Sequence, residues 1–583
     1  MNLRKIKRHR PQQGASAGAP PLLAAMLDKG RGYQQQGRLD LAIDCYAKAT
    51  RLAPQDAVAV HQLGVAHYLK GELGLAEVYY RRACDLAPTL GSAHYNLGNL
   101  LIGQGKIMEA LPCLKEAARL EPDNDHALTN IGVALYELGR VEEAIVYFEE
   151  ALAVNPAASH LHSTLVSALH YLPEASAYDI MQKSRQWWKI HGRPLYRRLR
   201  HANVPAPTRR LKVGYLSPDF REHSISYFIT PLLEAHDRSQ YEVFCYSDVE
   251  KPDAATTEIK ALADHWRDSF HLSDEALTLA IERDGIDLLI DLTGHMTGNR
   301  LSVFARKPAP VQISWLGYPG TTGLPTIDYR LVDAITDPPG EADLTHSERL
   351  IRLPGCFLCY QPPTESLEPG SVPAESSGRF TFGSFNNPAK LNPPLIETWA
   401  ALLGQLPHSR LLLKGRHLSD HGVQLSFLDS FVGHGIPAAR ISFSPLLPGR
   451  REHLALYNDI DLCLDPFPYN GTTTTMEALW MGVPVLTLRG TRHASRVGSS
   501  ILQGLGRPDL IAATPESYIE TAIALASSPR QDRKDLRRQL LASSLCDRHL
   551  FARRLEDAYR QSWQAWCQGQ AGFTPKSSDD TTV

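Results

Sequence analysis

A run of hydroxyl side chains around residue 473 carries the most specific chemistry in the sequence. The segment Asp465–Gly471 reads DPFPYNG and is followed by TTTTMEALWMG, which starts at Thr472. This order predicts a strand, a turn and the first turn of a helix. Backbone N–H groups and the helix dipole favour an anion there, and threonine hydroxyls add donors. Ordinary N-capping needs only one threonine, so we interpret the segment as a phosphate site.

A lysine follows an earlier predicted strand of the same domain. Lys390 ends the sequence GSFNNPAK; it could face a phosphate, or it could be an ordinary surface lysine. The sequence has no GxxxxGK[ST] motif and no GxGxxG fingerprint, which argues against a P-loop enzyme and a nicotinamide dehydrogenase. The DxD sequence at Asp459–Asp461 runs into an apolar strand, and we interpret it as structural.

Two groups of apolar segments must position these residues. The first group, from Leu211 onwards, reads LKVGYLS, YEVFCYS, GIDLLIDLTG, PVQISWLG and DYRLVD. The second group reads RFTFGSF, RLLLKG, RISFSPL, IDLCLDPF and PVLTLRG. Nearly continuous apolar runs separated by helical stretches predict parallel strands covered on both faces. Two doubly wound sheets predict ligand sites beyond the carboxyl ends of the strands.

The first quarter of the chain is an array of repeats. Prolines recur every 34 residues, at Pro54, Pro88, Pro122 and Pro156. Two sets of glycines, beginning at residues 30 and 37, and two sets of alanines, beginning at residues 42 and 49, keep the same step. A 34-residue period with small residues where helices cross predicts four tetratricopeptide hairpins over residues 22–157.

Side-chain amides recur on the predicted first helices of these hairpins. Asn96 and Asn130 occupy equivalent positions, with Gln62 one repeat earlier. Each amide offers a donor and an acceptor, so the three could bind the backbone of an extended peptide. Repeat arrays commonly form concave binding surfaces; the alternative is that this array is a spacer or a cap on its neighbour.

Composition limits the partners and the compartment. The chain has 583 residues, which predicts about three or four domains, and its 61 basic and 63 acidic residues nearly balance, which gives no general footprint for nucleic acid. No apolar stretch has the length of a membrane span, and none follows the basic run Arg4–Arg10 as in a signal peptide. The nine cysteines resemble small buried hydrophobes more than a disulfide framework. We therefore expect a cytoplasmic protein.

A CxxC sequence at Cys356–Cys359 is too little for a zinc site, because no second pair lies nearby. We expect neither metal binding nor redox chemistry there.

The motifs after the repeats resemble those of the O-linked N-acetylglucosamine transferase family in its compact bacterial form. They are SPDFREHSISYF, IDLTGHMTGNR, WLGYPGTTG, GSFNNPAKLNP, FSPLLPGRREH and DPFPYNGTTTTMEALWMGVPVLTL, and with the repeats the match covers roughly residues 22–565. The resemblance implies an α plus α/β fold: an N-terminal tetratricopeptide solenoid followed by a GT-B glycosyltransferase of two Rossmann-like domains. It implies inverting transfer from UDP-N-acetylglucosamine to Ser or Thr hydroxyls of proteins, with no metal or other cofactor.

Period, composition and resemblance together predict the domain organisation. We expect a basic disordered tail at 1–21, the four repeats at 22–157, a capping half-repeat with connecting helices at 158–209, an N-terminal catalytic domain at 210–360, a linker at 361–378, a UDP-binding C-terminal catalytic domain at 379–545, and a C-terminal helix with a disordered tail at 546–583.

The family motifs also assign roles to the second catalytic domain. Lys390 would face the diphosphate, and Thr473 with Thr474 would hold its β-phosphate. His453 would flank the uracil. The other residues expected to contact the UDP-sugar are Asn387, where animal enzymes have glutamine, Glu477, which replaces an aspartate that binds the ribose, and Leu447 and Thr472.

Residues of the first catalytic domain would complete the site. His223 matches a histidine of the family that either removes the proton of the acceptor hydroxyl or only positions the substrate. In the second case the donor phosphates or water would take the proton. His295 and the loop residues Pro319, Gly320 and Thr321 would form the sugar and acceptor pocket, and the repeats would recruit protein or peptide acceptors.

Two other functions fit the same architecture. One is transfer of a different sugar, by a protein O-fucosyltransferase that uses GDP-fucose or by an N-glucosyltransferase. The other is a repeat scaffold whose catalytic domain is weak or inactive; the presence of Lys390, His223 and the threonine run argues against it.

Overall fold

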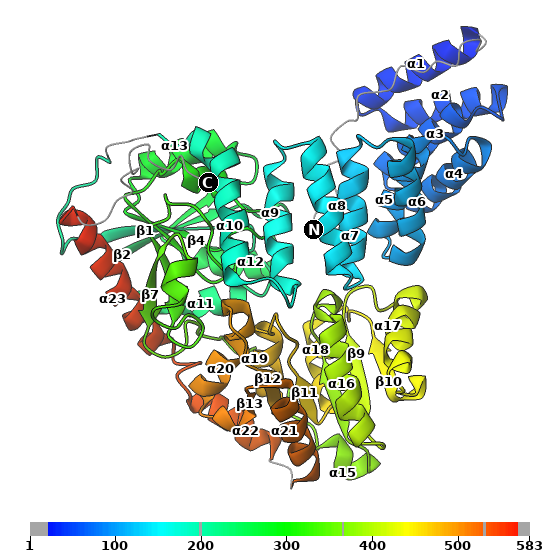
Figure 1. The fold of residues 1–583 in the computed structure, drawn as a ribbon. Coiled ribbons are helices and arrows are strands. Elements are labelled where there is room, and N and C mark those ends of the chain that lie inside the picture. Colours follow the sequence, from blue (N-terminus) through cyan, green and yellow to red (C-terminus); the bar gives the residue numbers. More distant parts are fainter. Residues whose placement is uncertain (1–20, 198–200, 364–366, 529–531, 570–583) are drawn as a thin grey trace, which may run out of the picture. The chain divides into compact units, whose positions relative to one another are not determined.

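The computed structural model describes residues 21–197, 201–363, 367–528 and 532–569. The described residues form two units (Figure 1). The first contains the helices up to Ala158 together with His417–Ser426, and the second contains both β-sheets. The basic tail expected at 1–21 and the end of the expected C-terminal tail lie outside the described residues, apart from Pro21 and a few residues after the last helix.

The first unit consists of helical hairpins, as the 34-residue period predicts. Helices α1 and α2, α3 and α4, α5 and α6, and α7 and α8 pack in pairs, and each pair also packs on the next. In each hairpin a glycine of the repeating pattern lies in the turn, and at Gly71 it adopts a left-handed φ of 88° that ends α3. The helices are α1 Pro21–Gln35, α2 Leu39–Leu52, α3 Ala57–Lys70, α4 Leu73–Leu86, α5 Gly91–Gly103, α6 Ile107–Leu120, α7 Asp125–Glu137 and α8 Val141–Val154.

Short helical elements connect the repeats to the sheets by sequence, and they belong to the second unit. They are α9 Ser159–Ala168, η1 Leu169–Tyr171, α10 Ala177–Trp187, η2 Trp188–Gly192 and η3 Arg193–Leu195. The buried Trp187 indole donates a hydrogen bond to the Ser159 carbonyl, 2.9 Å away, which ties α10 to the start of α9.

The first sheet is parallel throughout its described strands, with the order β3-β2-β1-β4-β5-β6-β7. This is the doubly wound order, in which the direction of strand addition reverses between β1 and β4. The strands are β1 Leu211–Ser217, β2 Tyr241–Ser247, β3 His265–Asp268, β4 Leu288–Asp291, β5 Val311–Ser314, β6 Tyr329–Asp333 and β7 Arg349–Leu353, and the helices are α11 Ser226–Ala235, α12 Ala254–Ala261, α13 Asp274–Asp284 and α14 Leu301–Ala305.

The second sheet repeats this topology in its described strands, with the parallel order β10-β9-β8-β11-β12-β13. Its direction of strand addition reverses between β8 and β11. The strands are β8 Thr381–Ser384, β9 Arg410–Lys414, β10 Ile441–Ser444, β11 Leu462–Leu464, β12 Val485–Leu488 and β13 Ile511–Ala512. The helices are α16 Pro393–Gln405, α17 His421–Gly433, α18 Arg450–Ala455, α19 Thr473–Trp480, α20 Val497–Leu505, α21 Pro515–Ser527 and α22 Arg533–Ala542. The residues of α17 up to Ser426 are those that belong to the first unit.

All ten predicted strands are confirmed, and the strands that the sequence did not reveal lie at the edges of the sheets. β3 and β7 are partly exposed and contain Arg, His and Asp where a buried strand would have apolar side chains. β13 spans only Ile511–Ala512. An edge strand needs no continuous apolar run, so the pattern that marked the central strands is absent from these three.

The predicted linker and the DxD sequence turn out to be in contact. A short helix, α15 (Pro373–Ser377), lies within the linker, and the Ala374 N–H donates to Asp461 Oδ1, 3.0 Å away. The other oxygen of Asp461 accepts the Thr381 N–H at the start of β8. Asp461 therefore anchors backbone, which agrees with the structural interpretation of this sequence.

The last described helix, α23 (Arg548–Cys567), packs on the first sheet domain (Figure 1, red). The Tyr559 and Tyr215 hydroxyls lie 3.2 Å apart, and Glu556 Oε1 lies 2.8 Å from Nδ1 of the buried His236. The chain thus passes through the second sheet domain and returns to the first. The sequence placed this helix in a segment of its own; in the structure it belongs to the core of the first sheet domain.

Adding one methyl group at a helix crossing should destabilise the repeats. A Cβ atom at Gly132 in α7 would lie 2.4 Å from the buried Phe148 ring in α8, whereas one at Gly74 in α4 would meet nothing within 4 Å. We expect Gly132→Ala to cost about 1–3 kcal/mol of local stability, whereas Gly74→Ala should be neutral or stabilise its helix by up to about 1 kcal/mol. Hydrogen exchange of peptides covering α7 and α8 measures the effect, with peptides from the sheet domains as reference. Equal protection in the two variants would contradict the close crossing.

Candidate active site

Two chain segments meet at the carboxyl ends of β8 and β11, where the strand order reverses. Lys390 lies in η5 (Pro388–Lys390) after β8, and the threonine run begins α19 after β11. Lys390 Nζ donates to the Asn470 carbonyl at 2.8 Å and to Asn386 Oδ1 at 2.9 Å. Thr474 Oγ1 donates to the same Asn386 oxygen at 3.1 Å. The structure therefore brings Lys390 and the threonine run together at the place where doubly wound folds bind ligands.

Asp465 shapes the turn between β11 and α19. Its Oδ1 accepts the Gly471 N–H at 2.6 Å, and its Oδ2 accepts the Thr487 hydroxyl at 2.7 Å. A Cβ atom at Gly498 would lie 2.4 Å from Oδ2, so glycine is needed there for the carboxylate to fit. Burial raises the pKa of Asp465 to about 6. The buried carboxylate thus fixes the turn that carries the threonine run.

The first turn of α19 is open to an anion. Thr472 occupies the N-cap position, but its side chain makes no capping hydrogen bond. The first N–H groups of a helix have no partner within the helix. These groups and the positive end of the helix dipole therefore remain available. Capping does not explain Thr472 in this structure.

The positive charge of Lys390 is only partly compensated. Burial lowers the pKa of Lys390 to about 8, and the Asp465 carboxylate acts in the opposite direction. The Tyr469 ring lies under the ammonium, with its centroid 4.6 Å from Nζ. The buried Nδ2 atom of Asn386 has no hydrogen-bond partner among the described residues. An anion would satisfy this donor and stabilise the ammonium.

His453 lies in a polar chain at the side of this site. Its Nδ1 is 2.6 Å from Lys414 Nζ, and its Nε2 is 2.8 Å from Glu477 Oε2. An ammonium can only donate, so Nδ1 accepts and Nε2–H donates to Glu477, whose side chain is buried. The rings of Phe385 and Tyr457 flank the imidazole at centroid distances of 6.4 and 5.5 Å. The sequence analysis did not assign Lys414, because nothing but its place at the end of a predicted strand marks it.

Arg450 adds a second unsatisfied cation, which the sequence analysis did not assign. Its guanidinium lies over the Tyr227 ring of α11 at 3.9 Å, so it joins the two sheet domains. Its Nε and one terminal nitrogen are buried without a hydrogen-bond partner in the described part of the chain.

Leu447 lies half-buried in the loop before α18. Asn387 is exposed, and its side chain accepts the Ala389 N–H at 3.2 Å, which caps η5.

His223 lies in the loop after β1 of the first sheet domain and is partly exposed. Its Nδ1 accepts the Ile225 N–H at 3.3 Å and lies 3.7 Å from Asp219 Oδ2. Burial lowers the pKa of His223, so the neutral form dominates at neutral pH. With Nδ1 accepting from the backbone, the proton of the neutral ring is on Nε2.

His295 is buried, and both of its ring nitrogens have partners. Nδ1 lies 3.1 Å from the Ser163 hydroxyl, and Nε2 lies 2.8 Å from the Thr322 carbonyl. Burial lowers the pKa of His295 to about 3. The side chain therefore connects α9, the end of β4 and the loop that contains Pro319, Gly320 and Thr321. This arrangement suits a residue that holds the loop in place.

The structure also shows an aromatic cluster that sequence reasoning missed. His170 Nε2 lies 2.9 Å from the Tyr318 hydroxyl, and the His170 ring packs edge-on against Tyr469 at a centroid distance of 6.3 Å. Tyr469 in turn underlies Lys390. No spacing or motif singles out His170.

Asn386 was also missed by the sequence analysis. A signal for it was present, because Asn386 adjoins Asn387 in the motif GSFNNPAK.

The predicted ladder of amides in the first unit already makes internal hydrogen bonds. Asn96 Nδ2 lies 2.8 Å from His61 Nε2, and Asn130 Nδ2 donates to Asn99 Oδ1 at 3.3 Å. Asn130 is only 9% exposed, and Gln62 is half-buried. Asn96 and Asn130 therefore already have partners within the array.

Among the described residues, no group of three or more His, Cys, Asp or Glu side chains is arranged to hold a metal ion. Within the same ranges, no helix has the length and apolar character needed to cross a membrane.

Family models match most of the chain. The model of glycosyl transferase family 41 matches residues 180–361 and 375–555, and a tetratricopeptide repeat model matches residues 27–90 and 95–159. The first model covers both sheets and includes the segments of Lys390, His453 and the threonine run.

Individual proteins show the same similarity. A tomato (Solanum lycopersicum) protein named probable UDP-N-acetylglucosamine–peptide N-acetylglucosaminyltransferase SPINDLY is 40% identical over 409 residues, which are 69% of this chain and 44% of that protein. The Arabidopsis thaliana relative SEC, whose name gives the same probable activity, is 33% identical over 62% of this chain and 38% of its own length. The chain thus spans less than half the length of these curated relatives.

A solved structure matches nearly the whole chain. A mutant of the Thermobaculum terrenum O-GlcNAc transferase is 36% identical, with a TM-score of 0.74, and the match covers 94% of this chain and 98% of that one. Both sheet domains have the Rossmann-like topology of a GT-B fold. The chain belongs to glycosyl transferase family 41, with tetratricopeptide repeats preceding its two sheet domains.

Proposed function

We propose that this protein transfers N-acetylglucosamine from UDP-N-acetylglucosamine to Ser or Thr hydroxyls of other proteins. The observation that carries the proposal is the pairing of Lys390 with the uncapped start of α19 at the carboxyl ends of β8 and β11. The names of the relatives that match both sheets support the donor and the acceptor.

The diphosphate of the donor would bind where Lys390 and α19 meet. The ammonium, the free N–H groups of the first helical turn and Asn386 Nδ2 supply donors without a metal ion. The acceptor hydroxyl oxygen attacks the anomeric carbon from the face opposite the phosphate, and the bond from that carbon to the β-phosphate oxygen breaks with inversion. Negative charge then grows on the leaving diphosphate, and donors already in position stabilise it.

The nucleoside would lie beside His453. Lys414 and Glu477 fix the orientation of that imidazole, and Phe385 and Tyr457 flank it, so the ring is a rigid surface for a base to stack on. The unsatisfied nitrogens of Arg450 lie between the sheet domains and can donate to an anionic or carbonyl oxygen of the nucleotide. Glu477 would reach the ribose hydroxyls with its remaining oxygen.

We assign His223 a positioning role. Its Nδ1 accepts a backbone N–H, so the neutral ring presents Nε2–H, which donates a hydrogen bond and cannot remove a proton. The donor phosphate or a water molecule would then take the proton of the acceptor hydroxyl. His295 and Glu348, which accepts a hydrogen bond from the Thr321 hydroxyl, would hold the 319–321 loop beside the sugar.

The choice of donor is the first test of the proposed function. We expect UDP and UDP-N-acetylglucosamine to bind in calorimetry with EDTA present, because protein donors replace the metal. We also expect labelled N-acetylglucosamine to appear on proteins of a host lysate. Binding that needs Mg²⁺ or Mn²⁺ would contradict metal-free binding. Labelling from GDP-fucose or UDP-glucose alone would assign another donor, and no transfer from any of these donors would favour a scaffold.

The pH dependence of UDP binding tests the charge of Lys390. Its pKa of about 8 means that the ammonium is present below pH 8 and is lost as the pH rises through that value. We expect UDP affinity to be highest below pH 8 and to fall by up to about tenfold per unit above it. Lys390→Met should bind UDP weakly at every pH and should lower kcat by roughly 10²–10³. A parent curve as flat as that of the variant would show that Lys390 does not face the diphosphate.

The peptide groove can be tested separately from the chemistry. If Asn96 and Asn130 bind peptide backbone, replacing both with Ala should lower kcat/KM for long acceptors by roughly 5- to 150-fold. UDP affinity and donor hydrolysis should not change. Asn99→Ala is the matched control, because it removes the same internal bond to Asn130 from a position outside the ladder. Undiminished transfer by the double variant would identify the repeats as a cap or as a platform for another partner.

A further inference from the structure

The Lys390 ammonium lies against the ring of Tyr469, a residue to which the sequence gave no role. Nζ is placed over this ring, 4.6 Å from its centroid. The carbonyl of the next residue, Asn470, accepts a hydrogen bond from the same Nζ at 2.8 Å. Two adjacent residues of the turn between β11 and α19 therefore contact the ammonium, one through an aromatic face and the other through a carbonyl oxygen.

Hydrogen bonds fix the turn on both sides of Tyr469. The Asn470 N–H donates to the Ala494 carbonyl at 2.9 Å. Before the tyrosine, the Phe467 carbonyl accepts from Asn392 Nδ2 at 2.7 Å. The backbone that carries the ring is thus held in place, and the ring stays where the ammonium lies.

Aromatic residues of η1 pack against the Tyr469 ring. The Tyr171 ring is tilted towards it at a centroid distance of 4.8 Å, and the His170 ring lies edge-on at 6.3 Å. Both η1 side chains are buried. The orientation of the Tyr469 ring is therefore set by neighbours from another part of the chain as well as by its own turn.

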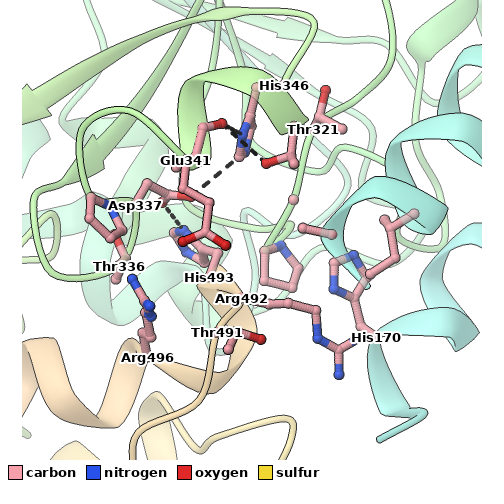
Figure 2. Close-up of a pocket in the computed structure, with 17 residues that line it drawn as sticks. His170, Thr321, Thr336, Asp337, Glu341, His346, Thr491, Arg492, His493 and Arg496 are labelled. Carbon is pink, nitrogen blue, oxygen red and sulfur yellow. Dashed lines mark hydrogen bonds and ion pairs between the residues drawn. The ribbon is translucent and has the colours of Figure 1, made fainter. Parts of the chain in front are cut away.

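Contacts from both sheet domains hold η1 in turn. Arg492, which follows β12, donates to the carbonyl oxygens of Leu169 at 3.3 Å and Leu172 at 2.8 Å. His170 Nε2 lies 2.9 Å from the Tyr318 hydroxyl, which belongs to the first sheet domain. The side chains of His170 and Arg492 both line the small cavity drawn in Figure 2. The residues that support the Tyr469 ring are thus themselves anchored.

An aromatic face suits a lysine that must meet a diphosphate. The face of the ring carries partial negative charge, which stabilises a cation above it. Burial lowers the pKa of Lys390 to about 8, and the Asp465 carboxylate acts in the opposite direction. The Tyr469 ring also favours the charged form. Because the ring carries no net charge, it repels an incoming anion less than a second carboxylate would.

The titratable groups around the ring stay uncharged while Lys390 titrates. Burial holds the pKa of the Tyr469 phenol well above its usual range and also raises the pKa of Tyr318. Burial holds the pKa of His170 well below its usual range. Tyr171 also faces the ring. The ring therefore acts on the ammonium as a neutral aromatic face.

We propose that Tyr469 is a positioning residue for the transfer reaction: its ring, backed by η1, holds the Lys390 ammonium charged and in place for the leaving diphosphate. Tyr469 acts through Lys390 and need not touch the sugar. The inference rests on the proposed function, because it concerns the charge that the diphosphate of the donor meets at Lys390.

A series of side chains at position 469 tests the role of the aromatic face. Tyr469→Phe keeps the face and removes the hydroxyl. Difluoro- and trifluorophenylalanine at this position keep nearly the size of the ring and withdraw electrons from its face. Tyr469→Leu removes the ring and leaves an apolar side chain that excludes water. Calorimetry measures the UDP affinity of each protein from about pH 6 to about pH 10, and thermal unfolding checks the fold.

We expect the pH at which UDP affinity begins to fall to decrease by about 0.4–1.5 units in Tyr469→Leu, because only the charged form of Lys390 loses an attraction. Tyr469→Phe should stay within about 0.3 units of the parent, since both rings present a similar face. Each step of fluorination should move the curve from that of Tyr469→Phe towards that of Tyr469→Leu. The ionisation of UDP is common to all curves, so their differences report Lys390.

Three results would count against the proposal or its basis. Coinciding curves for the phenylalanine and fluorinated proteins, or a shift to higher pH in Tyr469→Leu, would overturn it, because the ring would then only exclude water. A shift in Tyr469→Phe as large as that in Tyr469→Leu would assign the effect to the hydroxyl and also overturn it. A parent that does not bind UDP would refute the proposed function itself.

Lys390→Met provides the control for action through the ammonium. In this background Tyr469→Leu should change UDP affinity by less than about twofold, because no charge is left to stabilise. Equal losses in the two backgrounds would show that Tyr469 acts independently of Lys390 and would overturn the proposal. If Tyr469→Leu fails to fold, the fluorinated series decides, since its rings have nearly the size of phenylalanine.

Discussion

The Lys390 ammonium is a cation in a place where water cannot fully solvate it, and the architecture of the second sheet domain compensates for this. Nζ is held by an oxygen from the segment after β8 and one from the segment after β11, so the two strands must be neighbours. Asp465 lies buried nearby and fixes the connecting turn, and glycines at 471 and 498 leave room for its carboxylate. These contacts compensate only part of the positive charge of Lys390, and the remaining charge attracts an anion.

Much of the fold could be predicted because the central strands are buried on both faces and the repeats keep one period. Both patterns can be recognised along the chain without knowing which residues meet in space. The edge strands could not be predicted, because β3 and β7 are partly exposed and contain charged residues that interrupt the apolar pattern. The place of α23 was equally hidden: its contacts to Tyr215 and His236 join residues more than three hundred positions apart.

Some residues of the candidate site could likewise be predicted from the sequence, and others could not. Lys390, the threonine run and His453 lie in segments whose composition already pointed to chemistry, and the structure shows how two of these segments meet. His170 and Lys414 gave no such signal. The first is one histidine among 23, and the second ends an ordinary strand. His170 matters because its ring packs against Tyr469, which lies under Lys390, and Lys414 matters because it fixes the tautomer of His453. Both properties exist only once distant residues have been brought into contact.

The return of α23 to the first sheet domain has a consequence for how this enzyme architecture can be divided. A cut in the 361–378 segment does not separate two self-sufficient halves, because the amino-terminal fragment would expose the apolar surface that Phe551, Leu555 and Trp563 cover. Gene fusions, swaps with a relative and split reporters must keep α23 with the first sheet domain. Recombination between members of such a family is thereby limited: replacing the second sheet domain alone requires two crossover points, one on each side of an inserted module.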